Sequence, residues 1–134
     1  KELEGADRVI GLVKEMIPPE RAFFTSFLPD VLQLARATAP EWGRGLLVDR
    51  LAGKLTGCRN AVAAATLLDC EYFLPNFHRL NEEWSDVART AGLKIIPWTI
   101  NAPADVKKAR SVKVDGLITD CPVDVKTFLK IRKP

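Results

Sequence analysis

Small polar and aromatic residues recur where the apolar segments of this sequence end. These residues are Thr25 and Ser26, Asp49, Asn76, Trp98 and Thr99, and Thr119 and Asp120. Hydroxyl and amide groups fix the orientation of a ligand by hydrogen bonding, and aromatic rings form the apolar walls of a pocket. These residue types predict a binding site. They do not by themselves predict catalysis.

The residues that would carry out catalysis are not evident in this sequence. His78 is its only histidine, and we expect it to lie on the surface. No base lies near Ser26 in sequence to make it a nucleophile. Cys58, Cys70 and Cys121 are widely spaced and form no CxxC pair, which argues against a zinc site or a disulfide framework and for reduced thiols in a cytoplasm-like compartment.

Several strand-end residues also have a purely structural interpretation. Trp98 can close one end of a barrel as a partly buried aromatic residue, and Ser26 can satisfy a backbone group. Asn101 is expected to cap the helix that follows it, and Thr119 and Asp120 are expected to cap the last helix. Asp49 ends an apolar segment but receives no role.

The elements that must position these residues alternate between strands and helices. We expect strands at 22–27, 44–50, 69–77, 93–100 and 114–120, where apolar runs are bounded by Gly, Pro or Asp. Helices are expected at 7–17, 31–39, 51–66, 81–92, 104–112 and 122–131. Such alternation predicts an α/β fold of parallel βα units.

Two parallel architectures fit this alternation. No strand end carries GxGxxG or GxxxxGK[ST], so a dinucleotide-binding or P-loop sheet is not indicated. In a (β/α)8 barrel, active sites are built at the carboxyl ends of the strands, where the polar residues fall here. A complete barrel takes about 250 residues. The 134 residues therefore predict either the C-terminal part of a barrel or an open sheet of five units.

Composition excludes two other classes of protein. The 20 basic and 17 acidic residues are interspersed, which does not give the basic face expected of a nucleic-acid binder. No apolar run approaches the ~20 residues of a membrane span. We therefore expect no nucleic-acid partner, no membrane span and a cytoplasmic location.

Four motifs in this order carry a resemblance to a known family. They are SF at 26–27, LPNF at 74–77, AGLKIIPWTIN at 91–101 and VDGLITDCP at 114–122. Together they resemble the C-terminal half of glycerophosphodiester phosphodiesterases, over about residues 7–130. Two positions depart from the family pattern: Lys113 stands where a glycine usually precedes Val-Asp-Gly, and Pro75–Asn76 inverts the usual Asn-Pro order.

The resemblance implies that residues 1–134 are a partial domain, strands four to eight of a TIM (β/α)8 barrel of the PLC-like phosphodiesterase type. It implies hydrolysis of glycerophosphodiesters to glycerol 3-phosphate and an alcohol with a divalent cation, Mg²⁺ or Ca²⁺. Ser26, Phe27, Asn76, Trp98 and Thr99 would line the substrate pocket.

The family's His-Arg-Gly, Glu-x-Asp and Glu-x-Lys segments lie on the first three strands, and the sequence has no counterpart of them. We therefore expect no catalytic residue and no metal ligand in this chain, and no activity from it alone. We expect it to continue upstream, pair with a polypeptide carrying the N-terminal half, or self-associate through open sheet edges. The alternative is a non-catalytic half-barrel that binds a phosphorylated ligand or a protein.

Overall fold

Four parallel strands form the sheet of this protein, whose computed structural model describes residues 2–49 and 57–130. Neighbours in the sheet are neighbours in sequence, in the order β1 (Phe23–Ser26), β2 (Gly43–Val48), β3 (Tyr72–Pro75) and β4 (Lys94–Ile95). Every pair is parallel. Parallel neighbours need a crossover connection, which is usually a helix. The order and direction of the strands are those of consecutive βα units, as the sequence predicted.

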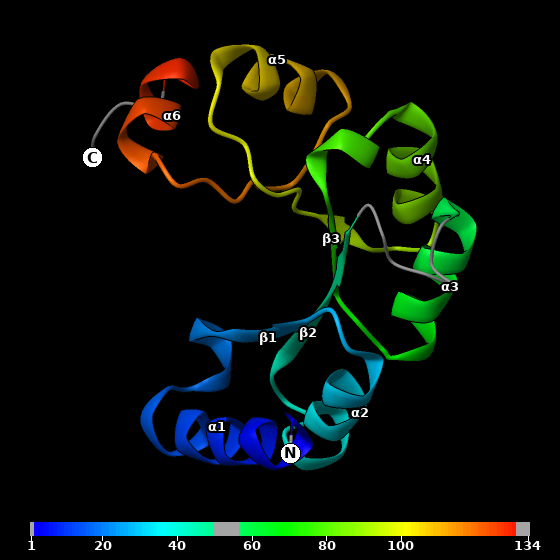
Figure 1. Cartoon of the computed structure of the whole chain (residues 1–134), viewed down its shortest axis with the longest axis vertical. Helices are drawn as coiled ribbons and strands as arrows, with labels where there is room; N and C mark the ends of the chain where they lie inside the picture. The colour runs from blue at the N-terminus through cyan, green and yellow to red at the C-terminus, as the bar shows by residue number, and fades with distance from the viewer. Residues whose placement is uncertain (1, 50–56, 131–134) are drawn as a thin grey trace.

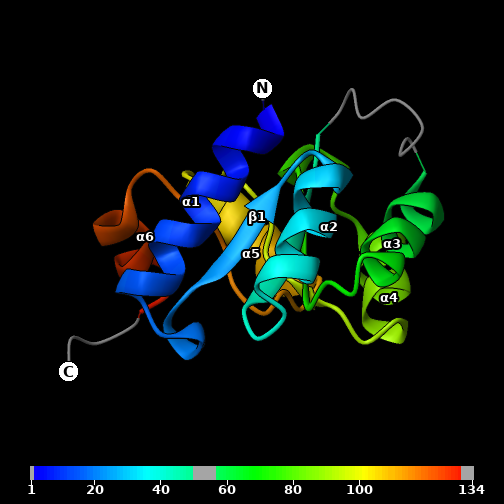
Figure 2. The same ribbon diagram turned by 90° about the horizontal axis from the view of Figure 1, so that it is seen from below.

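Six α-helices of the described residues precede, separate and follow the strands in an arc (Figure 1; turned by 90° in Figure 2). They are α1 (Glu2–Met16), α2 (Pro29–Thr38), α3 (Cys58–Leu67), α4 (Glu82–Thr90), α5 (Pro103–Ser111) and α6 (Pro122–Phe128). Two 3₁₀ turns, η1 (Pro19–Arg21) and η3 (Phe77–Arg79), complete the described elements. None of the described helices has the length and apolar character that a membrane crossing requires.

Local sequence explains the helix boundaries. Proline begins α2, α5 and α6, where its missing N–H is not needed. Asn81 caps α4 by accepting a hydrogen bond from the Trp84 N–H, and Gly92 follows that helix with φ of 77°, the left-handed region that glycine favours. Residues 51–56 of the third expected helix, and Arg50 of the second expected strand, lie outside the described residues.

The fifth expected strand, 114–120, is not a regular strand in the structure. It runs beside the segment after β4 and exchanges hydrogen bonds with it. The Ile118 N–H donates to the Pro97 carbonyl and the Ile100 N–H donates to the Ile118 carbonyl, both at 2.9 Å. Pro97 has no N–H to donate, so the ladder is interrupted and β4 itself ends at Ile95. The segment nevertheless occupies the next position along the sheet.

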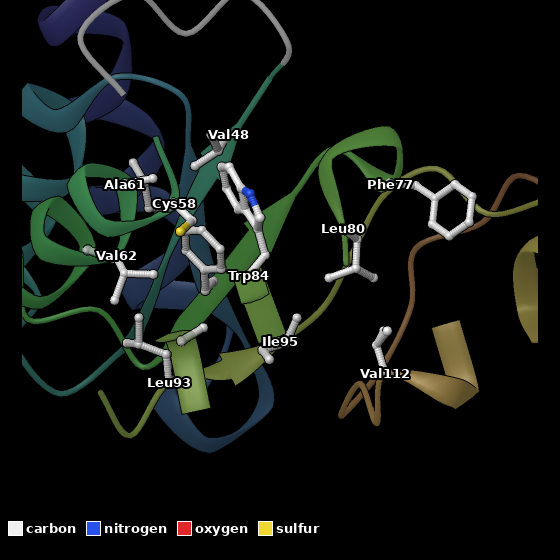
Figure 3. Close-up of a cluster of buried hydrophobic side chains, with 14 of the residues drawn as sticks. Val48, Cys58, Ala61, Val62, Phe77, Leu80, Trp84, Leu93, Ile95 and Val112 are labelled. Carbon is white, nitrogen blue, oxygen red and sulfur yellow. The ribbon is translucent and has the colours of Figure 1, made fainter. Parts of the chain in front are cut away.

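One face of the sheet packs against the helices. Leu46, Val48, Phe73 and Ile95 are completely or nearly completely buried there, among side chains of α3 and α4 such as Val62 (Figure 3). A smaller cluster joins Ile10 of α1 to Ala35, Ala39 and Trp42. These two clusters hold the helices on the outer side of the sheet.

The opposite face of the sheet carries the alternate residues of each strand. Phe23 packs on Tyr72 with ring centroids 4.3 Å apart, and Gly45 faces the side chains of Thr25 and Leu74. This is the inward-facing set of a barrel, because side chains alternate between the two faces of a strand. Phe23 is 41% exposed, so the described part of the chain covers this inner face incompletely.

Candidate site at the carboxyl ends of the strands

Asn76 and Trp98 are adjacent at the carboxyl end of the sheet. They form a parallel bridge just beyond β3 and β4, in which the Trp98 N–H donates to Pro75 and the Phe77 N–H donates to Trp98. The indole Nε1–H donates to the Leu74 carbonyl at 2.9 Å. The backbone and the indole of Trp98 are thus both hydrogen-bonded to the β3 segment. Trp98 is half-buried, which leaves part of its ring available to a ligand.

Phe27, at the end of the first strand of the sheet, contacts Trp98, which follows the last strand. Their ring centroids are 5.4 Å apart and their planes make an angle of 82°, an edge-to-face arrangement that aromatic pairs favour. Phe27 follows β1, whereas Trp98 follows β4, so the contact spans the inner side of the curved sheet. Because Phe27 is 48% exposed, the pair forms an accessible aromatic wall.

Asp49 also belongs to this group, although from the sequence alone it receives no role. It follows β2, and its Oδ1 accepts a hydrogen bond of 3.1 Å from Nδ2 of Asn76. The Asn76 Oδ1 accepts from the His78 N–H. These two bonds fix both ends of the amide. In the sequence, the one indication of this role was that an acidic residue directly follows an apolar strand.

Ser26 and Thr99 lie at the same end of the sheet with less evident roles. The Ser26 Oγ accepts a hydrogen bond of 3.0 Å from the Leu28 N–H, so it satisfies a backbone group at the turn into α2. Thr99 follows Trp98 through a cis peptide bond, and its side chain is exposed. The His78 side chain is also exposed, and the residue contributes its backbone N–H to Asn76.

The expectation that Asn101 caps a helix is wrong. Its Oδ1 accepts from the Thr119 hydroxyl and the Asp120 N–H, and its Nδ2 donates to an Asp120 carboxylate oxygen, each at 3.0 Å. The residues before α5 and α6 are Ala102 and Cys121, and neither makes a side-chain capping bond. Thr119 and Asp120 therefore do not cap α6 as expected. The three residues instead tie the loop after β4 to the end of segment 114–120.

The described residues supply no metal centre. Within 2–49 and 57–130, no three His, Cys, Asp or Glu side chains lie close enough to hold an ion. The groups with raised pKa values also lie elsewhere: burial raises the pKa of Cys70 to about 11, and the hydrogen bond that Lys94 donates to the Glu71 carboxylate raises the pKa of Lys94 near the start of β4.

Parallel βα units whose polar and aromatic residues meet at the carboxyl ends of the strands are the arrangement found in (β/α)8 barrels. The model of the glycerophosphoryl diester phosphodiesterase family matches residues 2–124. The chain belongs to that family. Its fold is therefore part of the family's barrel, as the sequence motifs implied.

Related proteins show the same fold over a longer chain. A glycerophosphodiester phosphodiesterase of Caldanaerobacter subterraneus is 26% identical over 116 residues, which are 87% of this chain and 45% of the relative. A structure from Silicibacter pomeroyi superposes with a TM-score of 0.85 at 24% identity, covering 96% of this chain and 44% of its own.

A phosphodiesterase of Oleispira antarctica, solved with its product sn-glycerol-3-phosphate, gives a TM-score of 0.81 at 22% identity, covering 96% of this chain and 50% of its own. The present chain thus spans about half the length of the relatives it matches.

Proposed function

We propose that this chain forms part of the substrate pocket of an enzyme that hydrolyses glycerophosphodiesters to glycerol 3-phosphate and an alcohol. The observation that carries the proposal is the Phe27–Trp98 aromatic pair beside Asn76, at the carboxyl ends of strands in a family barrel. The product-bound Oleispira structure supports it, because a protein of the same fold binds glycerol 3-phosphate. We assign residues 1–134 to one partial domain of five βα units.

In this proposal the five candidate residues bind the substrate and do not react with it. Phe27 and Trp98 form an apolar wall for the carbon skeleton of the diester, since aromatic faces bury hydrocarbon efficiently. Asn76, held by Asp49, presents a preoriented amide. Ser26 and Thr99 add hydroxyl groups at the rim. Binding of this kind positions the phosphodiester for groups that act on it.

The reacting groups come from outside the described residues. A phosphodiester anion requires positive charge near its non-bridging oxygens and a proton donor for the leaving alkoxide. A divalent cation would supply that positive charge, but the described residues do not form a site for one. We therefore assign no step through a metal to this chain, and we expect the 134 residues alone to be inactive.

A chimeric barrel tests the pocket assignment. The part of the Caldanaerobacter relative that this chain does not match is fused in front of it, and release of sn-glycerol 3-phosphate is measured. We expect Phe27→Ala to lower kcat/KM about tenfold, the loss of ~1.4 kcal/mol of binding. Phe23→Ala is the matched control, because Phe23 begins the strand that Phe27 directly follows and is similarly exposed, but lies at the opposite end of that strand.

The control fixes the meaning of each outcome. If Phe27→Ala and Phe23→Ala have equal effects, Phe27 belongs to the packing of the barrel and not to its pocket. If the chimera binds glycerol 3-phosphate without hydrolysing any diester, the non-catalytic binding half-barrel replaces the enzyme.

A further inference from the structure

Phe27 and Trp98 form a corner with two aromatic walls and no available hydrogen-bonding group. Their ring planes meet at 82° with centroids 5.4 Å apart, so a compact group in the angle between them contacts the faces of both rings. The Phe27 ring has no polar atom, and the indole Nε1–H of Trp98 already donates to the Leu74 carbonyl at 2.9 Å. A hydroxyl-rich alcohol would lose its hydrogen bonds to water in this corner without replacing them, which is costly. The corner therefore suits a group that needs no hydrogen bonds.

The corner lies in the layer of side chains at the carboxyl end of the sheet. The register of β2 and β3 brings Asp49 opposite Asn76, and a hydrogen bond of 3.1 Å joins the two side chains. Asn76 in turn bridges to Trp98, so the three residues share one layer, which the Phe27 ring reaches from the end of β1. The layer thus holds a carboxylate, and a carboxylate attracts a cation and repels an anion.

The faces of aromatic rings elsewhere in the chain are occupied by its own cations. The charged groups of Arg79, Lys94 and Lys108 lie 5.4, 5.4 and 4.8 Å from the centroids of neighbouring rings. Attraction of this kind between a cation and the negative face of a ring acts within about 6 Å. Among residues 2–49 and 57–130, no lysine or arginine lies in this way over Phe27 or Trp98. The cation that these two rings can attract is therefore one that belongs to a ligand.

We propose that the Phe27–Trp98 corner binds a quaternary ammonium group, so that the enzyme prefers glycerophosphodiesters whose alcohol is choline or a similar methylated amino alcohol. This proposal rests on the proposed function, because it names the alcohol of the same substrate. The methyl groups of a quaternary ammonium need no hydrogen bonds and carry its charge to aromatic faces, as in other aromatic sites for such ligands. A neutral alcohol of the same shape keeps the apolar contact and loses the attraction of the charge to the rings.

The test compares two diesters of the same shape and different charge. They are glycerophosphocholine and the 3,3-dimethylbutyl diester, in which carbon replaces the nitrogen. In the chimeric barrel we expect kcat/KM for the choline diester to be about tenfold higher. Phe27→Leu keeps an apolar side chain and removes its aromatic face, so it should reduce this ratio about threefold or more. Phe23→Leu is the matched control, because Phe23 begins β1 at the opposite end and should leave the ratio unchanged.

Equal kcat/KM values for the two diesters would overturn the proposal, as would a preference that Phe27→Leu leaves unchanged in a variant whose circular dichroism shows it to be folded. If the folded chimera hydrolyses neither diester, the proposed function fails, and binding of choline chloride to this chain decides the inference. We then expect choline, but not 3,3-dimethylbutanol, to shift the NMR signal of the Trp98 indole N–H, which is the indole signal missing from Trp98→Phe. No shift with choline, or equal shifts with both compounds, would overturn the proposal.

Discussion

Gly45 lies where the inner face of the sheet is most tightly packed, and its replacement by alanine tests the barrel geometry. A Cβ at this position would lie 3.1 Å from the Tyr72 Cβ and 3.4 Å from the Thr25 Cγ2. It would also come closer to the Leu74 Cδ1 than real carbon atoms approach one another. Leu74 is completely buried, so its methyl group has little space in which to move.

We therefore expect Gly45→Ala to lower the free energy of unfolding by about 1–3 kcal/mol, the usual cost of overpacking a core. This is a large share of the 5–15 kcal/mol typical of a domain. Urea denaturation of the chain measures it. Gly11→Ala is the control: no atom lies within 4 Å of its added Cβ, and alanine within α1 should stabilise by about 0.5–1 kcal/mol.

A double-mutant cycle identifies the cause. Leu74→Val removes the methyl group that the new Cβ meets, so the two substitutions together should cost less than the sum of their separate costs, by about 1 kcal/mol. Strict additivity, or a Gly45→Ala variant as stable as the parent, would refute the close approach of β2 and β3 on the inner face.

Three further predictions concern stability in denaturation experiments. Lys113 has φ of 56°, so Lys113→Gly should raise the free energy of unfolding by about 0.5–1 kcal/mol. Lys107→Gly within α5 should lower it by a similar amount. Changes of the same sign in both variants would contradict the left-handed backbone at Lys113. The buried Ser85 hydroxyl donates to the Val112 carbonyl at 2.6 Å, so Ser85→Ala should cost about 1 kcal/mol, and no loss would show that bond to be dispensable. Burial raises the pKa of the Cys70 thiol from 9.0 to about 11. The neutral thiol therefore contributes fully to the free energy of unfolding below pH 9, and this contribution, at most about 2–3 kcal/mol, is lost between pH 9 and 11. If the free energy of unfolding of Cys70→Ala depends on pH as that of the parent does, this assignment is refuted.

Local chemistry made much of the fold predictable from the sequence. Proline at helix starts, Asn81 before α4 and Gly92 after it act through residues a few positions away, so their effects can be inferred from sequence alone. The glycine that the family usually places at position 113 also has a physical reason, because Lys113 adopts a left-handed backbone there. The irregular course of 114–120 was harder to foresee, since it depends on pairing with Pro97.

The site was less predictable because its contacts join distant parts of the chain. Position at strand ends, together with the family motifs, indicated that Phe27, Asn76 and Trp98 would lie at one edge of the sheet. It could not show that Phe27 contacts Trp98, or that Asp49 holds Asn76, because those contacts depend on the curvature of the sheet. Asn101 was misassigned for the same reason: a local cap was expected, but its partners lie on segment 114–120.

The most direct test of the central claim is release of sn-glycerol 3-phosphate by a barrel completed with the amino-terminal part of the Caldanaerobacter relative. Glycerophosphocholine is the substrate, and a divalent cation is supplied. The account predicts hydrolysis by the completed barrel and none by either part alone. A folded, completed barrel that binds the cation yet releases no glycerol 3-phosphate from this or any other glycerophosphodiester would contradict it.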